Sequence, residues 1–214
     1  TYEALTDESK GMARALFLRL IEPGATDQDM TRRRAAQSEL AYADPVKTAL
    51  MQIVAKTFVD ARLLTQDRSG NTETIEVSHE ALIREWERLG AWLHSAREDV
   101  LLMKRIAADV DEWTVTGRDD ALVYEGRRLV DAQRWAERAQ PSATEAAFIA
   151  AGTAKAERMA AEERERQAER LRLAEEKAGA EERARVAESA RATRARRAAT
   201  FAGAVGVVAV VAAV

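Results

Sequence analysis

The sequence predicts a mainly α-helical protein that contains one small β-hairpin. Three observations carry this prediction. Apolar residues recur at helical spacing over most of residues 7–138, a short β-prone stretch interrupts them at residues 61–79, and residues 142–198 lack proline and consist mainly of Ala, Glu and Arg. On this pattern we divide the chain into segments 1–95, 96–140, 141–198 and 199–214.

Three helices are predicted before the hairpin. The first covers residues 7–21, with Asp7 as its N-cap and a Pro-Gly pair at residues 23–24 to end it. A short second helix starts at Ser38. The third starts at residues 44–45, because Asp at the cap followed by Pro at the first helical position favours a helix start. Its predicted buried side chains are Leu50, Ile53, Val54 and Phe58.

The hairpin and the helix after it complete a recognisable order of elements. Residues 61–66 and 74–79 predict two short strands, joined by a turn at residues 67–71 with a Gly-Asn tip. Helical spacing then resumes at steps of four, three and four with Leu82, Trp86, Leu89 and Leu93. Three helices followed by a β-hairpin have the order of a winged helix-turn-helix unit, which we assign to residues 1–95.

Two amphipathic helices are predicted to form the helical extension of residues 96–140. The first has its apolar side at Met103, Ile106, Val110 and Trp113 and ends near residues 116–117. The second starts at Asp119 and ends before Pro141, with an inward side formed by Leu122, Leu129 and Ala136 and with Trp135 beside them. Because their apolar faces need a partner, we expect these helices to dock together or onto the first 95 residues.

Residues 141–198 predict one long charged helix. Opposite charges lie three or four positions apart in the pairs Glu162–Arg166, Glu169–Arg172, Glu181–Arg185 and Glu188–Arg191. Each pair adds only about 0.2–0.5 kcal/mol, but Ala-rich sequence is already helix-prone. Large apolar residues do not alternate regularly at steps of three and four, so a solvated single helix and a coiled coil both stay open.

The last segment, residues 199–214, contains no charged residue. As a helix it rises about 24 Å, against a hydrocarbon core of about 30 Å, so we interpret it as a truncated transmembrane helix. The alternative is a buried helix or an Ala/Val-rich strand. Arginines crowd its N-terminal flank at positions 191, 194, 196 and 197. By the positive-inside rule they place residues 1–198 in the cytoplasm, anchored to the inner membrane as part of a larger membrane protein.

Composition excludes several kinds of chemistry. With no Cys and only two His, the chain has no disulfides and is a poor candidate for a zinc site. It contains no Gly-x-x-x-x-Gly-Lys-Ser/Thr loop, no dinucleotide fingerprint and no nucleophile elbow. We interpret the carboxylate pairs Asp109/Asp111 and Asp119/Asp120 as surface charges rather than an acid–base couple. We therefore expect no enzyme activity, no metal and no cofactor in this chain by itself.

Nucleic-acid binding is also disfavoured. The third helix offers Lys47, Gln52 and Lys56 on its length, and residues 32–34 are all Arg. Residues 1–95 nevertheless carry 12 Lys and Arg against 15 Asp and Glu. Each contact with a DNA phosphate requires a cationic side chain, so an acidic module of this kind has too few cations to favour DNA binding.

The cluster of most functional interest is Ser-His-Glu at residues 78–80, where the last strand becomes a helix. In one interpretation His79 caps that helix and Glu80 complements its dipole. In the other, the junction faces a neighbouring domain, and His79 donates a hydrogen bond to a ligand held there. The other histidine, His94, is predicted to lie on the surface.

Several ordered motifs resemble one known family. The runs LFLRLIEPG (16–24), TRRR (31–34), FVDARLLT (58–65) and VSHEALIREWERL (77–89) resemble the winged-helix portion of bacterial STAND-class NTPases. They are most similar to the subgroup in which this module precedes a membrane span and a WD-repeat propeller. The run ALVYEGRRLVDAQRW (121–135) is similar to that subgroup's next helical segment.

The resemblance implies a nucleotide-controlled switch. In such proteins a P-loop ATPase domain precedes the winged helix and holds ADP, and exchange for ATP releases the winged helix and permits oligomerisation. A winged-helix His followed by an acidic residue contacts the ADP phosphate in related proteins, and His79-Glu80 is the matching pair here. The chain is then a non-catalytic segment that relays ADP/ATP state to homo-oligomerisation or the membrane. A protein-docking adaptor and a membrane-bound DNA-binding regulator are the alternatives.

Overall fold

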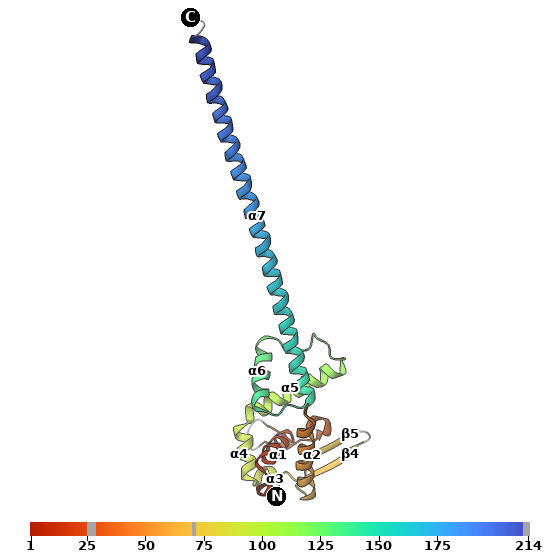
Figure 1. Ribbon diagram of the computed structural model, residues 1–214. Coiled ribbons are helices and arrows are strands. Elements are labelled where there is room, and N and C mark those ends of the chain that lie inside the picture. Colours follow the sequence, from red (N-terminus) through yellow and green to blue (C-terminus); the bar gives the residue numbers. More distant parts are fainter. Residues whose placement is uncertain (25–28, 70–71, 212–214) are drawn as a thin grey trace. The chain divides into compact units, whose positions relative to one another are not determined.

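A computed structural model describes residues 1–24, 29–69 and 72–211 (Figure 1). It is mainly helical, with small antiparallel sheets. Contacts group the chain into two units, residues 1–157 and residues 158–214. The elements are η1 (Tyr2–Ala4), α1 (Asp7–Arg19), β1 (Ile21–Glu22), β2 (Thr31–Arg32), β3 (Ala35–Ala36), η2 (Gln37–Leu40), α2 (Pro45–Asp60), β4 (Leu64–Ser69), β5 (Thr72–Val77), α3 (Ala81–Glu85), α4 (Glu87–Ser95), α5 (Arg97–Val115), α6 (Gly126–Arg138) and α7 (Ala143–Val211).

Helix α1 begins and ends within two residues of its predicted bounds. The N-cap is Thr6 rather than Asp7, because the Thr6 hydroxyl accepts a hydrogen bond from the backbone N–H of Ser9 at 3.3 Å. The helix ends at Arg19, ahead of the Pro-Gly pair, because Ile21 leaves helical conformation to join the two-stranded sheet β1–β2. The predicted second helix is a single 3₁₀ turn, η2.

Helix α2 starts where predicted, but Ile53, which was expected in the core, is exposed. The Asp44 carboxylate accepts from the Val46 N–H at 2.8 Å, and Pro45 is the first helical residue. Ile53 is 63% exposed, whereas Val54 is buried. Ile53 lies about 100° around the helix from Val54, on the side that faces away from the core. The buried side of α2 also includes Met51 and Phe58.

The hairpin is confirmed, and its two strands have the predicted length of six residues but lie closer to the turn, at residues 64–69 and 72–77. Strands β4 and β5 pair antiparallel from Leu64↔Val77 to Ser69↔Thr72. The Gly-Asn tip at residues 70–71 lies outside the described residues. Strand β3, which lies between α1 and η2 in sequence, pairs with β5, so the sheet order is β3-β5-β4.

The helix predicted to follow the hairpin is broken at Trp86. This residue is extended, with φ −89° and ψ 91°, and it separates α3 from α4. Its ring makes edge contacts with Phe17, Tyr2 and Trp92, at centroid distances of 5.1, 5.8 and 5.4 Å. Aromatic packing with three other segments therefore overrides the local helical spacing.

The two extension helices dock on the N-terminal elements, as expected. Their buried residues join one hydrophobic cluster that extends from Met12 to Ile149. Helix α5 buries the predicted apolar side, but α6 starts at Gly126 instead of Asp119. The segment before it is a loop, in which the Tyr124 ring makes an edge contact with the ring of Phe148 at a centroid distance of 4.9 Å.

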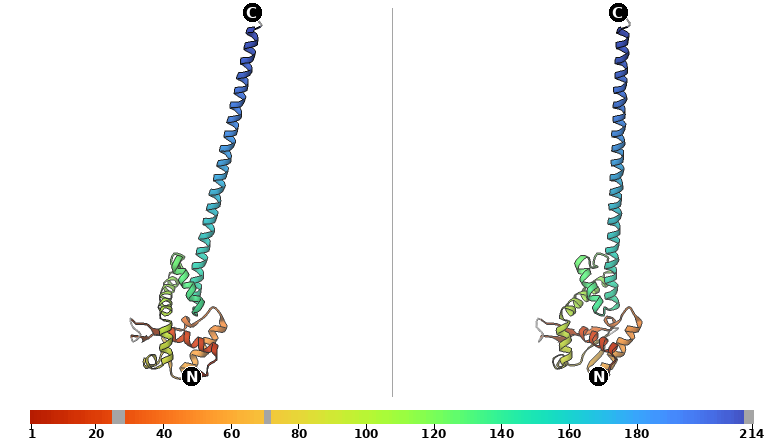
Figure 2. Two further views of the ribbon diagram at one scale, coloured as in Figure 1. Left: turned by 90° about the vertical axis from the view of Figure 1, so that its left-hand side faces the viewer. Right: turned by 60° about the vertical axis from the view of Figure 1, so that its left-hand side comes forward.

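Helix α7 confirms the predicted long helix and is continuous in Figures 1 and 2. All residues from 158 to 197 are exposed, including Leu171 at 66%. The pairs Glu162–Arg166 and Glu169–Arg172 form, whereas Arg185 pairs with Glu182 instead of Glu181. Within the described residues, no helix has an apolar stretch long enough to cross a bilayer. Residues 212–214 of the predicted apolar segment lie outside the described residues.

Candidate functional site

His79 and Glu80 form the junction between β5 and α3. The Ser78 N–H donates to the Leu63 carbonyl at 3.1 Å, which is the last rung of the hairpin. The carbonyls of His79 and Glu80 then accept from the N–H groups three residues ahead, at Leu82 and Ile83, and so begin the helix. Both the His79 and Glu80 side chains are exposed. The N-cap position is Glu80 and carries no side-chain cap hydrogen bond, so His79 does not cap α3.

A hollow of about 270 Å³ opens beside His79. Its lining residues lie just before β4, just after β5 and on α3. They are Arg62, Leu63, Ser78, His79, Ala81, Leu82 and Glu85. The Ser78 hydroxyl is buried and has no hydrogen-bond partner among the described residues. A buried hydroxyl without a partner carries a desolvation cost, so it is a ready donor for a group that enters the hollow.

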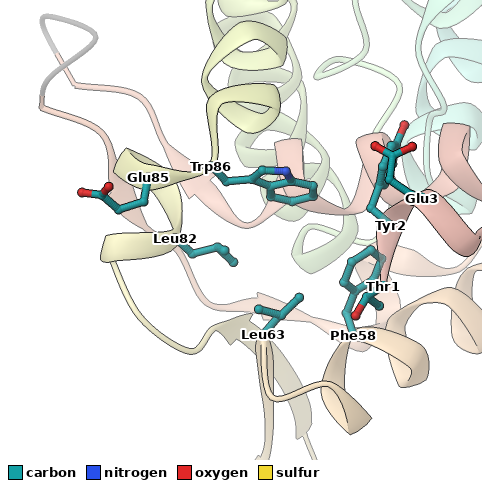
Figure 3. Close-up of a pocket in the computed structure, with 8 residues that line it drawn as sticks. All are labelled: Thr1, Tyr2, Glu3, Phe58, Leu63, Leu82, Glu85 and Trp86. Carbon is teal, nitrogen blue, oxygen red and sulfur yellow. The ribbon is translucent and has the colours of Figure 1, made fainter.

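A larger hollow of about 410 Å³ adjoins the first (Figure 3). It shares Leu63, Leu82 and Glu85 with the His79 hollow, and its remaining lining residues are Thr1, Tyr2, Glu3, Phe58 and Trp86. In Figure 3 the Leu63 and Leu82 side chains extend toward each other, and the Glu85 carboxylate points away from them. Leu63 and Leu82 therefore form an apolar wall that the two hollows share.

Arg62 stands at the mouth of the His79 hollow in an uncommon backbone conformation. It is one of two non-glycine residues with positive φ among those described, at 60°. Its N–H donates to the Val59 carbonyl, and the next N–H, of Leu63, donates to the Phe58 carbonyl, each at 2.9 Å. This left-handed residue closes the C-terminus of α2 and turns the chain into β4.

Other charged residues named from the sequence are engaged elsewhere. Arg33 pairs with Glu39 at 2.8 Å and Arg34 pairs with Glu76 at 3.2 Å. Asp109 accepts from the Tyr124 hydroxyl and from Arg128, so it is a structural carboxylate. In the part of the chain that the structure describes, no three His, Asp or Glu side chains form a group that could hold a metal ion.

Sequence reasoning missed a buried ion pair between α1 and the first turn of α7. The guanidinium of Arg19 donates to both carboxylate oxygens of Glu145, at 2.9 and 2.6 Å, and to the Gln140 carbonyl at 2.8 Å. Each charged residue is only 2% exposed. Burial opposes the charged form of Arg19, but the hydrogen bond and charge of Glu145 outweigh it and raise the pKa of the guanidinium.

Glu145 also helps to begin α7, together with Ser142. Glu145 accepts from the Ser142 N–H at 2.6 Å, and the Ser142 hydroxyl accepts from the Glu145 N–H at 3.3 Å. This reciprocal arrangement is a capping box, whose Ser-x-x-Glu spacing is visible in the sequence. The Ala143 N–H donates to the Ala41 carbonyl at 2.7 Å, so the first turn of α7 is bonded to two N-terminal segments.

Comparison with known proteins assigns the chain to a family. The family model described as novel STAND NTPase 1 matches residues 1–121, which include the whole hairpin, His79 and all of α5. A search of curated proteins and a search of solved structures found no match. Because the family model covers more than half of the 214 residues, this chain belongs to the novel STAND NTPase 1 family.

Proposed function

We propose that this chain is a non-catalytic regulatory segment of a STAND signalling ATPase. It relays the ADP or ATP state of a P-loop domain, located elsewhere in the same protein, to oligomerisation or to the membrane. Family membership supports the signalling-NTPase context. The chain itself contains no phosphate-binding loop, so its residues complete a nucleotide site instead of forming one.

We assign residues 1–95 to a winged helix. The order α1, β3, η2, α2, β4 and β5, and the sheet order β3-β5-β4, both support this assignment. In a DNA-binding winged helix, α2 would present cations to the major groove. Here its surface includes Val46 at 74% and Ile53 at 63% exposure, and Lys56 is paired with Asp60. Nucleic-acid binding is therefore not the favoured use of this module.

The observation that carries the proposal is the placement of His79. Its side chain is exposed at a strand–helix junction, and it adjoins a hollow that also contains the unpartnered Ser78 hydroxyl. An imidazole N–H at such an edge can donate to a phosphate oxygen of a nucleotide held by the facing P-loop domain. Glu80 beside it disfavours a bound anion, so the pair is suited to a contact that forms in one nucleotide state and breaks in the other.

The Arg19–Glu145 pair supplies the connection to α7. We propose that a shift of the N-terminal elements reaches α7 through this pair and the capping box at Ser142. We further propose that residues 199–214 attach the protein to the inner membrane and that a WD-repeat propeller follows, as in the subgroup that the motifs resemble. The uncharged composition of residues 199–214 and the arginines before them support the membrane part, which fractionation of cell membranes tests directly.

The nucleotide content of the full-length protein, purified in detergent, tests the switch. We expect ADP to co-purify, and we expect His79→Ala to release it about tenfold or more faster, because a hydrogen bond to a charged group is worth about 1.5–3 kcal/mol. His94→Ala is the matched control, since His94 is an exposed histidine on α4 away from the hollow. Absence of bound nucleotide, or equal release from wild type and His79→Ala, would contradict the sensor.

One observation favours a second candidate, the protein-docking adaptor. Val46 and Ile53 lie seven positions apart on α2, and seven residues are close to two helical turns, so both exposed side chains share one face. An adaptor predicts that Ile53→Asp abolishes partner capture while nucleotide content stays unchanged. A switch predicts instead that His79→Ala changes the nucleotide content.

A further inference from the structure

Arg62 and His79 lie on opposite sides of the open end of the hairpin, one before β4 and one after β5. The ladder pairs Leu64 with Val77, and the hydrogen bond from the Ser78 N–H to the Leu63 carbonyl extends it by one step. In an antiparallel ladder each step back on one strand is a step forward on the other. Arg62 and His79 are the next residues outward on the two sides, and both line the same hollow.

The left-handed backbone conformation of Arg62 suggests that its side chain has a functional role. The position closes a helix in the left-handed conformation, where glycine is the common residue because a Cβ is strained there. The Arg62 side chain is exposed, and the described residues provide it with neither an ion-pair partner nor a hydrogen-bond partner. Position 62 therefore has an arginine where glycine would adopt the backbone conformation with less strain, and the guanidinium makes no polar contact with the described residues.

The surrounding charges leave Arg62 available to an anion. Glu85 is the one carboxylate that lines the described part of this hollow, and Glu80 is next to His79 in sequence. Asp60, two residues before Arg62, is held by the ammonium group of Lys56 at 2.8 Å. A guanidinium and an imidazole thus converge on one hollow, with the Ser78 hydroxyl as a third donor.

We propose that Arg62 is a second phosphate-contacting residue, which binds the diphosphate group of ADP together with His79. This inference rests on the proposed function. Arginine suits the role because its planar fork can donate two parallel hydrogen bonds to one phosphate. ADP has two neighbouring phosphates. In this proposal His79 donates to one of them and Arg62, on the other side of the hairpin, donates to the other.

Arg62→Gly gives an unusually clear test, because its two expected effects have opposite signs. Glycine relieves the left-handed backbone, so the melting temperature of the 214-residue chain should stay equal or rise by about 2–4 °C. Loss of the guanidinium should speed ADP release from the full-length protein about tenfold or more. A variant that simply misfolds cannot be stabilised and lose ligand at once.

Arg118→Gly is the matched control, since Arg118 is the other arginine with positive φ and lies outside the hollow. It should leave ADP release unchanged. If His79→Ala releases ADP and Arg62→Gly does not, the Arg62 assignment is wrong while the proposed function stands. If the wild-type protein holds no nucleotide, the proposed function fails and this inference fails with it. Faster release from Arg62→Gly with unimpaired stability supports the assignment.

Discussion

Replacing Glu145 by Ala should destabilise residues 1–157 severely. The substitution leaves the Arg19 guanidinium buried without its carboxylate partner and removes the acceptor for the Ser142 N–H. Breaking a buried ion pair from one side costs about 3–5 kcal/mol, and a lost helix cap costs about 1 kcal/mol. We therefore expect the free energy of unfolding to fall by about 4–6 kcal/mol, a large part of the roughly 5–15 kcal/mol typical of a domain.

Urea unfolding followed by near-ultraviolet circular dichroism measures this loss, because Trp113 and Trp135 are buried and report on packing. The far-ultraviolet signal is less suitable, since it includes the exposed helix of residues 158–197. Arg172→Ala breaks an exposed pair with Glu169 and should cost less than about 0.5 kcal/mol.

The double variant Arg19→Met/Glu145→Leu separates the charge effect from general damage. Because apolar replacement of a whole buried pair is often neutral, it should recover most of the stability lost in Glu145→Ala, apart from the helix cap. A double variant as unstable as Glu145→Ala, or a single variant that loses less than about 1 kcal/mol, would refute the reasoning that the unpaired buried charge sets the penalty.

Two further predictions concern α7 and the loop before α6. Gly152→Ala should destabilise the protein by about 1–3 kcal/mol, because its Cβ would lie 2.8 Å from the Tyr124 carbonyl oxygen, whereas Gly11→Ala, which meets nothing within 4 Å, should stabilise α1 by up to about 1 kcal/mol in the same unfolding assay. Burial and the hydrogen bond to Asp109 raise the pKa of Tyr124 to about 12. Since the unfolded phenol loses its proton near pH 10, stability should fall as pH rises from about 10 to 12, and Tyr124→Phe should lack that fall in pH-dependent unfolding.

The elements that the sequence predicts correctly are those set by neighbouring residues. Helix α2 starts where Asp44 and Pro45 provide a cap and a fixed φ, and the hairpin follows from two β-prone runs around a turn. The break at Trp86 has no such local cause. It arises because the indole packs against rings from η1, α1 and α4, which only the folded chain brings together.

The candidate site divides in the same way. His79 is found from sequence because a strand period changes to a helix period at that point. The capping box marks Glu145 as a helix-start residue, but its partner Arg19 is 126 positions away and carries no local signal. The conformation of Arg62 could not be predicted from the sequence for a different reason. A left-handed residue at a helix end is recognised in a sequence by glycine or asparagine, and this position has neither.

A chain of direct contacts joins the His79 hollow to α7. Leu63 lines both hollows and Phe58 lines the larger one, and the Phe58 ring packs edge-on against Phe17 at 5.0 Å. Phe17 lies two residues before Arg19 on α1, so a displacement of the helix carries both. Contact alone does not establish coupling, which requires an element with two discrete arrangements.

We propose that the ion pair at the end of this contact chain is such an element. Two buried charges bonded at 2.6 Å cannot separate by small steps, because each partial separation leaves charge in a medium of low dielectric without solvent or partner. In this proposal the first turn of α7 is either docked on α1 through Arg19 and Glu145 or released into water. By linkage, a nucleotide contact at His79 of the kind proposed above would favour one of these two states of α7 if it favoured one position of α1.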